Sequence, residues 1–177
     1  LPIWPYDISM LNVSAMSFGS LSGNAIEALN GGAALGGFAH DTGEGSVTKH
    51  HRRFGGDLIW EIASAYFGCR DDNGSFNPEK FRERAASDQI KMISIKISQG
   101  AKPGLGGLLP GAKVNAEVAE ARGVPIGQTV VSPPAHSAFR TPLELIDFLD
   151  ELRELSGGKP VGFKLCIGSK REFLAIC

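Results

Sequence analysis

Short apolar segments alternate with helix-like segments along the 177-residue chain, and this alternation limits the possible folds more than any other feature. The apolar segments are too short for helices and end at glycine, proline or small polar residues. We expect strands in five places: 11–16, a brief stretch within 36–45, 89–98, 129–134 and 161–167. Strands that alternate with helices form a parallel sheet with crossover helices. The sequence therefore predicts an α/β protein.

Several of the expected helices have recognisable first and last residues. Ser22 and Asn77 are typical N-cap residues, and Thr141 forms a capping box with Glu144. The helix that follows Thr141 should stop at Gly157, because glycine readily ends helices. The other segments expected to be helical are 57–68, 113–122 and the one that begins in "SKREFLAIC" (169–177).

Polar residues lie at the ends of most of the expected strands. They are Ser17, Thr42 to Gly45, Gln99 to Lys102, Ser132 and Lys164. In a parallel barrel, binding groups lie at the carboxyl ends of the strands. An open doubly wound sheet binds ligands at the same edge. These positions therefore predict where a ligand binds without choosing between the two architectures.

The composition is that of an ordinary globular protein with an excess of glycine. The net charge of −1 gives no support to nucleic-acid binding, and no apolar run approaches the roughly 18 residues that cross a bilayer. Cys69, Cys166 and Cys177 form no CxxC pair, so we expect reduced thiols in a cytoplasmic protein and no metal site. The opening "LPIWPYD" has no signal-peptide layout and reads as the inside of a longer chain.

Two nucleotide-binding motifs fail, and the histidines do not predict a metal site. Lys113 comes one residue too late for a phosphate-binding loop, and Leu109 stands where a dinucleotide fingerprint requires glycine. We expect the adjacent His50 and His51 to lie in a solvated basic loop, because neighbouring imidazoles rarely converge on one metal ion. His136 could equally be a functional residue or a loop histidine with a satisfied hydrogen bond.

The strand at 89–98 leads into a glycine-rich loop that carries Lys102. The loop "GAKPGLGGLLPG" (100–111) has five glycines in twelve positions, and such a segment is costly to order and cannot pack a core. Glycine allows the backbone to approach a ligand closely, and Lys102 would supply positive charge to an anion. The alternative is a lysine that extends from an ordinary loop into solvent.

Five motifs in this order resemble the FMN-binding synthase domain of glutamate synthases. They are "SAMSFGSLSGNAIEAL" (14–29), "AHDTGEG" (39–45), "IKISQGAKPG" with "LPGAKV" (95–104, 109–114), "VSPPAHS" (131–137), and "LELIDFLDELRE" followed by "GFKL" (143–154, 162–165). The resemblance covers about 11–177 and looks closest to the stand-alone glutamate synthase-like branch. It implies a (β/α)8 TIM barrel, of which 11–177 would form the N-terminal part, with about the first five βα units, after a lead-in segment 1–10.

The resemblance also implies a reaction and a set of site residues. In that family, reduced FMN delivers hydride to the imine formed from 2-oxoglutarate and ammonia, which yields L-glutamate. The positions that match FMN contacts are Ser14, Ala15, Met16, Ser17, Thr42, Gln99 and Lys164. The positions that match substrate or catalytic groups are Glu44, Lys102 and Arg122, of which Lys102 and Arg122 would hold the keto acid. An iron–sulfur cluster occurs in the family, but its ligand motif is absent from this sequence.

Two features separate the chain from the family pattern. Leu105 and Leu108 stand where the family commonly has Glu and Gln, so a different small-acid substrate is one alternative. A catalytically silent fragment or scaffold is another. A complete barrel needs about 250 residues and eight strands. We therefore expect these residues to belong to a longer polypeptide, or to be completed by another copy, and to be inactive alone.

Overall fold

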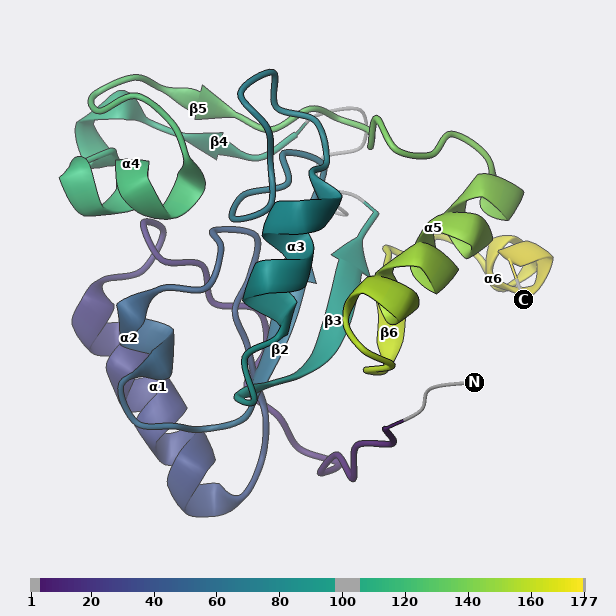
Figure 1. Cartoon of the computed structure of the whole chain (residues 1–177), viewed down its shortest axis with the longest axis horizontal. Coiled ribbons are helices and arrows are strands. Elements are labelled where there is room, and N and C mark those ends of the chain that lie inside the picture. The colour runs from purple at the N-terminus through teal and green to yellow at the C-terminus, as the bar shows by residue number, and fades with distance from the viewer. Residues whose placement is uncertain (1–3, 98–105, 177) are drawn as a thin grey trace.

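The computed structural model describes residues 4–97 and 106–176 (Figure 1). Four parallel strands form the main sheet in the spatial order β1 (His40–Asp41), β2 (Leu58–Ile62), β3 (Ile90–Lys96) and β6 (Val161–Lys164). A separate antiparallel pair joins β4 (Leu108–Leu109) to β5 (Val130–Val131). The predicted α/β class and parallel sheet are confirmed.

The helices of the described residues are α1 (Gly23–Gly36), α2 (Lys49–Arg52), α3 (Pro78–Ala85), α4 (Ala116–Arg122), α5 (Pro142–Leu155) and α6 (Lys170–Ile176). Three of them begin at the caps that the sequence predicted. Ser22, Asn77 and Thr141 accept hydrogen bonds from the first turns of α1, α3 and α5. The helix predicted at 113–122 begins later, because a short 3-10 turn precedes Asn115, which caps α4.

The segment 57–68 is a strand followed by a loop, so the helix predicted there is wrong. β2 places Leu58, Trp60 and Ile62 in the core and turns Glu61 to the other face. A short apolar run does not by itself distinguish a buried strand from a buried helix. The β-branched and aromatic residues of "LIWEI" favour the strand, and pairing with both β1 and β3 stabilises it.

Two segments predicted as strands lie outside the ladders of the main sheet. Within 11–16, a single parallel bridge joins Val13 to His40 at the edge of β1. The segment 129–134 contributes β5, which pairs with β4, and the two prolines that follow cannot donate to a longer ladder. The predicted five strands in one parallel sheet are therefore wrong for the described residues, which place four strands there.

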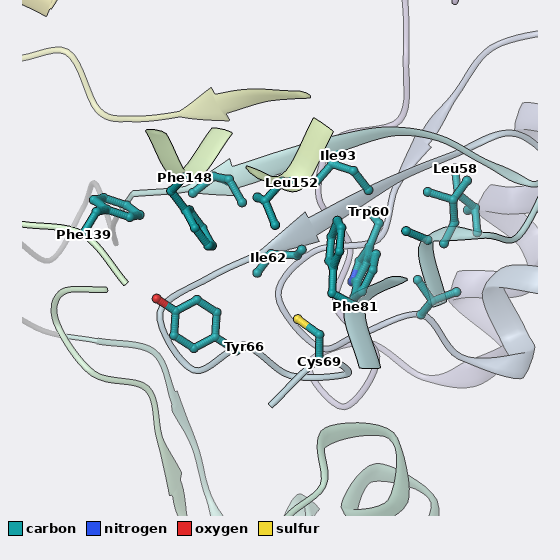
Figure 2. Close-up of a cluster of buried hydrophobic side chains, with 14 of the residues drawn as sticks. Leu58, Trp60, Ile62, Tyr66, Cys69, Phe81, Ile93, Phe139, Phe148 and Leu152 are labelled. Atoms are coloured by element: carbon teal, nitrogen blue, oxygen red, sulfur yellow. The ribbon is translucent and has the colours of Figure 1, made fainter. Parts of the chain in front are cut away.

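The main core fills the space between one face of the sheet and the helices α3 and α5 (Figure 2). Trp60 of β2 stacks on Phe81 of α3, with ring centroids 5.3 Å apart. Phe148 and Leu152 of α5 pack into the same cluster, which extends to Tyr66 in the loop after β2. Burial of each large apolar side chain contributes about 1.5–3 kcal/mol. These helices therefore cover the apolar face of the sheet and leave its polar face on the other side.

A smaller apolar cluster fixes the N-terminal segment beside the carboxyl ends of the strands. Phe18 packs there with Ile26 of α1, Phe67 of the loop after β2 and Val118 of α4. Because these residues come from four distant parts of the chain, the cluster holds 14–18 next to the loop after β1. This position decides which side chains meet at the polar face.

Candidate functional site

Each strand of the main sheet brings one ionisable residue to the same face near its carboxyl end. Asp41 ends β1, Glu61 lies in β2, Lys96 ends β3 and Lys164 ends β6. Residues that pair across a parallel ladder point to the same side of the sheet. The register pairs Asp41 with Ile59, Glu61 with Ser94 and Lys96 with Lys164. All four side chains therefore lie on the face away from α3 and α5.

The two lysines are paired with two different carboxylates. Lys96 Nζ lies 3.0 Å from Glu44 Oε2, and both side chains are largely buried. Lys164 Nζ hydrogen-bonds to Glu61 Oε2, and the Glu61 side chain is only 1% exposed. Glu61 Oε1 is also buried, but it has no hydrogen-bond partner among the described residues. A buried carboxylate oxygen without a donor is costly and marks a place where a proton or a ligand can bind.

Asp41 is the most perturbed acid of this cluster. Its burial raises its pKa to about 7, and the negative charge of Glu61 acts in the same direction. The Gly43 N–H, which donates to Asp41 Oδ1 at 2.9 Å, and the charges of Lys164 and Lys96 oppose this shift. Perturbed carboxyl groups of this kind are concentrated at functional sites. The cluster therefore combines two lysine ammonium groups with an acid whose pKa is raised.

The loop after β1 closes the edge of this cluster with backbone groups. Thr42 Oγ1 accepts a hydrogen bond from the Glu61 amide at 3.1 Å and donates to the Gly43 carbonyl at 3.1 Å. Gly43 has a φ of 64°, and a Cβ at this residue would lie 2.7 Å from Ser17 N. Only glycine allows the loop to lie this close to 14–17. The Met16 N–H donates to the Asp41 carbonyl at 3.1 Å, which joins the two segments further.

Arg122 lies next to the same loop, in the smaller apolar cluster. Its side chain donates to the Phe18 carbonyl at 3.1 Å, and its guanidinium lies 4.9 Å from the centre of the Phe67 ring. Arg122 is 3% exposed. Burial lowers the pKa of its guanidinium, and the charge of Glu44 acts in the opposite direction. In this structure Arg122 links the Phe18 backbone to the Phe67 side chain. A contact between Arg122 and a substrate stays a prediction.

The structure brings together part of the predicted site. Met16, Ser17, Thr42, Glu44 and Lys164 converge at the carboxyl edge of the sheet. Gln99 and Lys102 lie outside the described residues, as does Leu105. Leu108 is described, in β4, with its side chain 61% exposed.

Sequence reasoning missed three members of the cluster, namely Asp41, Glu61 and Lys96. A glutamate inside the apolar run "LIWEI" is a signal that could have identified Glu61. We predicted a helix over this run, and a helix would not place Glu61 beside the ends of neighbouring strands. Glu61 was therefore not included in the predicted site. Lys96 alternates with buried isoleucines in β3, which places it on the polar face once the strand is known.

The structure places all of the histidines named in the sequence. His136 is buried and hydrogen-bonds to the Tyr66 hydroxyl at 3.1 Å and to the Lys96 carbonyl at 2.8 Å, which fits the alternative of a loop histidine with a satisfied hydrogen bond. The solvated loop predicted for His50 and His51 is wrong. His51 is fully buried beside His40, and the two ring nitrogens of the mostly buried His50 lie 2.7 Å from Glu27 Oε1 and 2.8 Å from Glu117 Oε1. Burial lowers the pKa of both His51 and His40 to about 4.

Neither of the two described cysteines belongs to the charged cluster. Cys69 and Cys166 are free thiols, and burial raises the pKa of Cys69 to about 12. Within 4–97 and 106–176, no group of three or more His, Cys, Asp or Glu residues is arranged to hold a metal ion. In the same part of the chain, no helix is both long enough and apolar enough to cross a bilayer.

A sequence profile described as "Conserved region in glutamate synthase" matches residues 8–177. The chain belongs to the glutamate synthase family. It is 42% identical over 168 residues to the glutamate synthase large subunit-like protein YerD of Bacillus subtilis, covering 94% of this chain and 32% of that protein. It is 36% identical over 153 residues to the archaeal-type glutamate synthase (NADPH) of Thermotoga maritima, covering 86% of this chain and 28% of that protein.

A third member of this glutamate synthase family extends the comparison to archaea. The archaeal glutamate synthase (NADPH) of Methanocaldococcus jannaschii is 34% identical over 165 residues, covering 93% of this chain and 30% of that protein. The chain therefore spans about a third of the length of these curated relatives. The charged cluster lies within the part of the family that the profile matches.

Proposed function

We propose that the chain forms the N-terminal part of an FMN-dependent oxidoreductase of the glutamate synthase type. The observation that carries the proposal is the convergence of Lys96 and Lys164 with 14–17 and 42–45 at the carboxyl edge of a parallel sheet. Active sites of (β/α)8 barrels lie at this edge. In the proposed barrel, α3 and α5 lie outside and the charged face lies inside. The remaining strands come from a longer polypeptide or from another copy.

The residues of this edge fit a flavin. FMN, when bound, supplies the hydride. Reduction places negative charge on the N1–C2=O edge of the ring, and a neighbouring lysine stabilises that charge. Lys164, which is 42% exposed at its side chain, is accessible for this contact, whereas the Lys96 ammonium is committed to Glu44. In this proposal the ring lies against the backbone of 14–17, and Thr42 and Gln99 supply polar contacts.

The proposed substrates are 2-oxoglutarate and ammonia, and the proposed product is L-glutamate. Lys102 supplies a cation for one carboxylate in this proposal. Arg122 contributes positive charge beside Glu44. Carboxylates bind lysine and arginine through short charge-assisted hydrogen bonds. Glu44 lies in the loop that follows β1, where its carboxylate orients the Lys96 ammonium.

A different small acid is the second candidate substrate, and Leu108 favours it. The Leu108 side chain is 61% exposed in β4 and cannot hydrogen-bond to a carboxylate. The family commonly has Gln at this position. Replacing Gln by Leu at this position would weaken the binding of a smaller or less polar keto acid less than it weakens the binding of 2-oxoglutarate.

Two measurements on the full-length protein test the proposal. Heat-released cofactor is identified by chromatography, with FMN as the expected result and FAD or no flavin as the opposing one. The reduced protein is then mixed anaerobically with ammonium and 2-oxoglutarate, and L-glutamate is measured by mass spectrometry as the flavin is reoxidised. Reoxidation by another keto acid, but not by 2-oxoglutarate, favours the second candidate.

A further inference from the structure

Asp41 and Glu61 lie on one face of two neighbouring strands, β1 and β2. Asp41 pairs in register with Ile59, so Glu61 lies two residues further along the adjacent strand on the same side. The Thr42 hydroxyl accepts from the Glu61 amide, which ties the end of β1 to the same stretch of β2. The two carboxyl groups therefore share one partly dehydrated environment.

The charged groups around the pair lie on β3, β6 and the loop after β1. Lys164 of β6 binds Glu61 Oε2, and Lys96 of β3 binds Glu44 of the loop after β1. The Gly43 N–H donates to Asp41 Oδ1. The adjacent segment 13–17 carries no titratable side chain. Among the described residues, Asp41 thus forms no ion pair, and Glu61 Oε1 is buried without a hydrogen-bond donor.

We propose that Asp41 and Glu61 hold one proton between them at neutral pH, and that this proton makes the pair a general acid of the site. Two carboxylates in one dehydrated site do not both ionise readily, because each charge opposes the other. A proton on Asp41 removes this repulsion and leaves Glu61 paired with Lys164. The raised pKa of Asp41, caused first by burial and then by Glu61, is consistent with this arrangement.

The proposed reaction requires such a proton, so this use of the pair rests on the proposed function. Ammonia adds to the keto carbon and forms a carbinolamine. The Asp41 O–H then gives its proton to the carbinolamine hydroxyl, the C–O bond breaks, and water leaves with formation of the iminium ion. Asp41 remains as a carboxylate near Lys96 and Lys164 and recovers a proton from solvent. An acid whose pKa lies near the working pH is well suited to this step.

Infrared titration of the full-length protein tests the shared proton without reference to any reaction. We expect the C=O stretch of a protonated carboxyl group that is lost as the pH rises through neutrality. Asp41→Asn should remove this band, because Asn keeps the oxygen that accepts from Gly43 but cannot titrate. Asp147→Asn, at an exposed position on α5, should retain it. Glu61→Gln should keep the band and lower its midpoint by about one pH unit, because the neighbouring negative charge is gone.

The outcomes separate the inference from the proposed function. A band that persists in Asp41→Asn, or the absence of any carboxyl group that titrates near neutral pH, overturns the shared proton even if the protein makes L-glutamate. A band that behaves as expected supports the shared proton even if no amination is seen. In an active enzyme, Asp41→Asn should lower kcat at least tenfold with little change in KM. Asp147→Asn should change neither, and an unchanged kcat in Asp41→Asn overturns the role as general acid.

Discussion

Lys96 and Lys164 pair in register on neighbouring parallel strands, and each forms an ion pair with a different carboxylate. Like charges that face each other across a ladder destabilise a sheet. Glu44, from the loop after β1, neutralises Lys96, and Glu61, from β2 on the other side of β3, neutralises Lys164. The carboxyl edge of the sheet therefore carries two lysines on neighbouring strands, and each is compensated by a carboxylate of its own.

Lys164→Met should destabilise the fold by about 1–3 kcal/mol, because it leaves the buried Glu61 carboxylate without its cation. Urea unfolding of the full-length protein measures this change. Lys91→Met is the matched control, since Lys91 lies in β3 and reaches Asp57 only at 4.0 Å on the surface. Adding Glu61→Gln to Lys164→Met should restore much of the lost stability. Equal losses for Lys164→Met and Lys91→Met would contradict the pairing.

The stability of the protein should fall as the pH decreases from about 6.5 to about 4, because His40 and His51 are buried in their neutral forms. The unfolded chain binds protons on both imidazoles first, so protonation favours unfolding across this window. His40→Phe should reduce the pH-dependent loss of unfolding free energy by an amount on the order of 2 kcal/mol. Neither ring nitrogen of His40 has a hydrogen-bond partner among the described residues that phenylalanine would leave unpaired. Thermal unfolding at several pH values measures it. His50→Gln serves as the comparison, and an equal change there would count against this assignment.

Arg122→Lys should reduce stability by about 1–3 kcal/mol, because lysine cannot keep both the bond to the Phe18 carbonyl and the contact with the Phe67 ring. Chemical unfolding gives the loss. Arg70→Lys is a suitable control, since Arg70 contacts the same ring at 5.7 Å from a more exposed position. If Arg122 also binds the keto acid, substrate affinity will fall under conditions in which the variant is fully folded. Unchanged affinity would limit Arg122 to its structural role.

Lys102→Ala should weaken binding of the anionic substrate by about 1.5–3 kcal/mol, roughly tenfold to a hundredfold, and leave flavin affinity nearly unchanged. The reason is the loss of one charge-assisted contact to a carboxylate. Titration of the oxidised full-length protein with 2-oxoglutarate measures the first quantity, and release of FMN measures the second. Lys113→Ala, at an exposed position of the 3-10 turn, should change neither. Equal losses of flavin and substrate affinity would show that Lys102 has another role.

Leu108→Gln should tighten binding of 2-oxoglutarate by about 0.5–1.5 kcal/mol, because an amide adds a hydrogen bond that leucine cannot make. The exposed position of Leu108 means that the change should cost little stability. Competition between 2-oxoglutarate and pyruvate, in the parent protein and the variant, measures the shift in preference. Loss of affinity for both acids would argue against a substrate contact at this position.

Local sequence patterns determined the class of the fold and many of its boundaries. The caps at Ser22, Asn77 and Thr141 act within a few residues, so the sequence predicts them directly. The motifs that resemble the synthase domain pointed to Met16, Ser17, Thr42, Glu44 and Lys164, and these residues do converge. Helix starts and short motifs depend on neighbours along the chain, which is why they could be read without the structure.

Only the tertiary structure decided that 57–68 contains a strand and that His51 is buried. An apolar run of five residues suits either a helix or a strand until it has partners, and β1 and β3 supply them. The charged cluster has the same origin. Glu44 and Lys96 are 52 residues apart in the chain, and Glu61 and Lys164 are 103 apart. Their ion pairs, and the position of Asp41 beside Glu61, follow from the order and register of the strands, which no local pattern encodes.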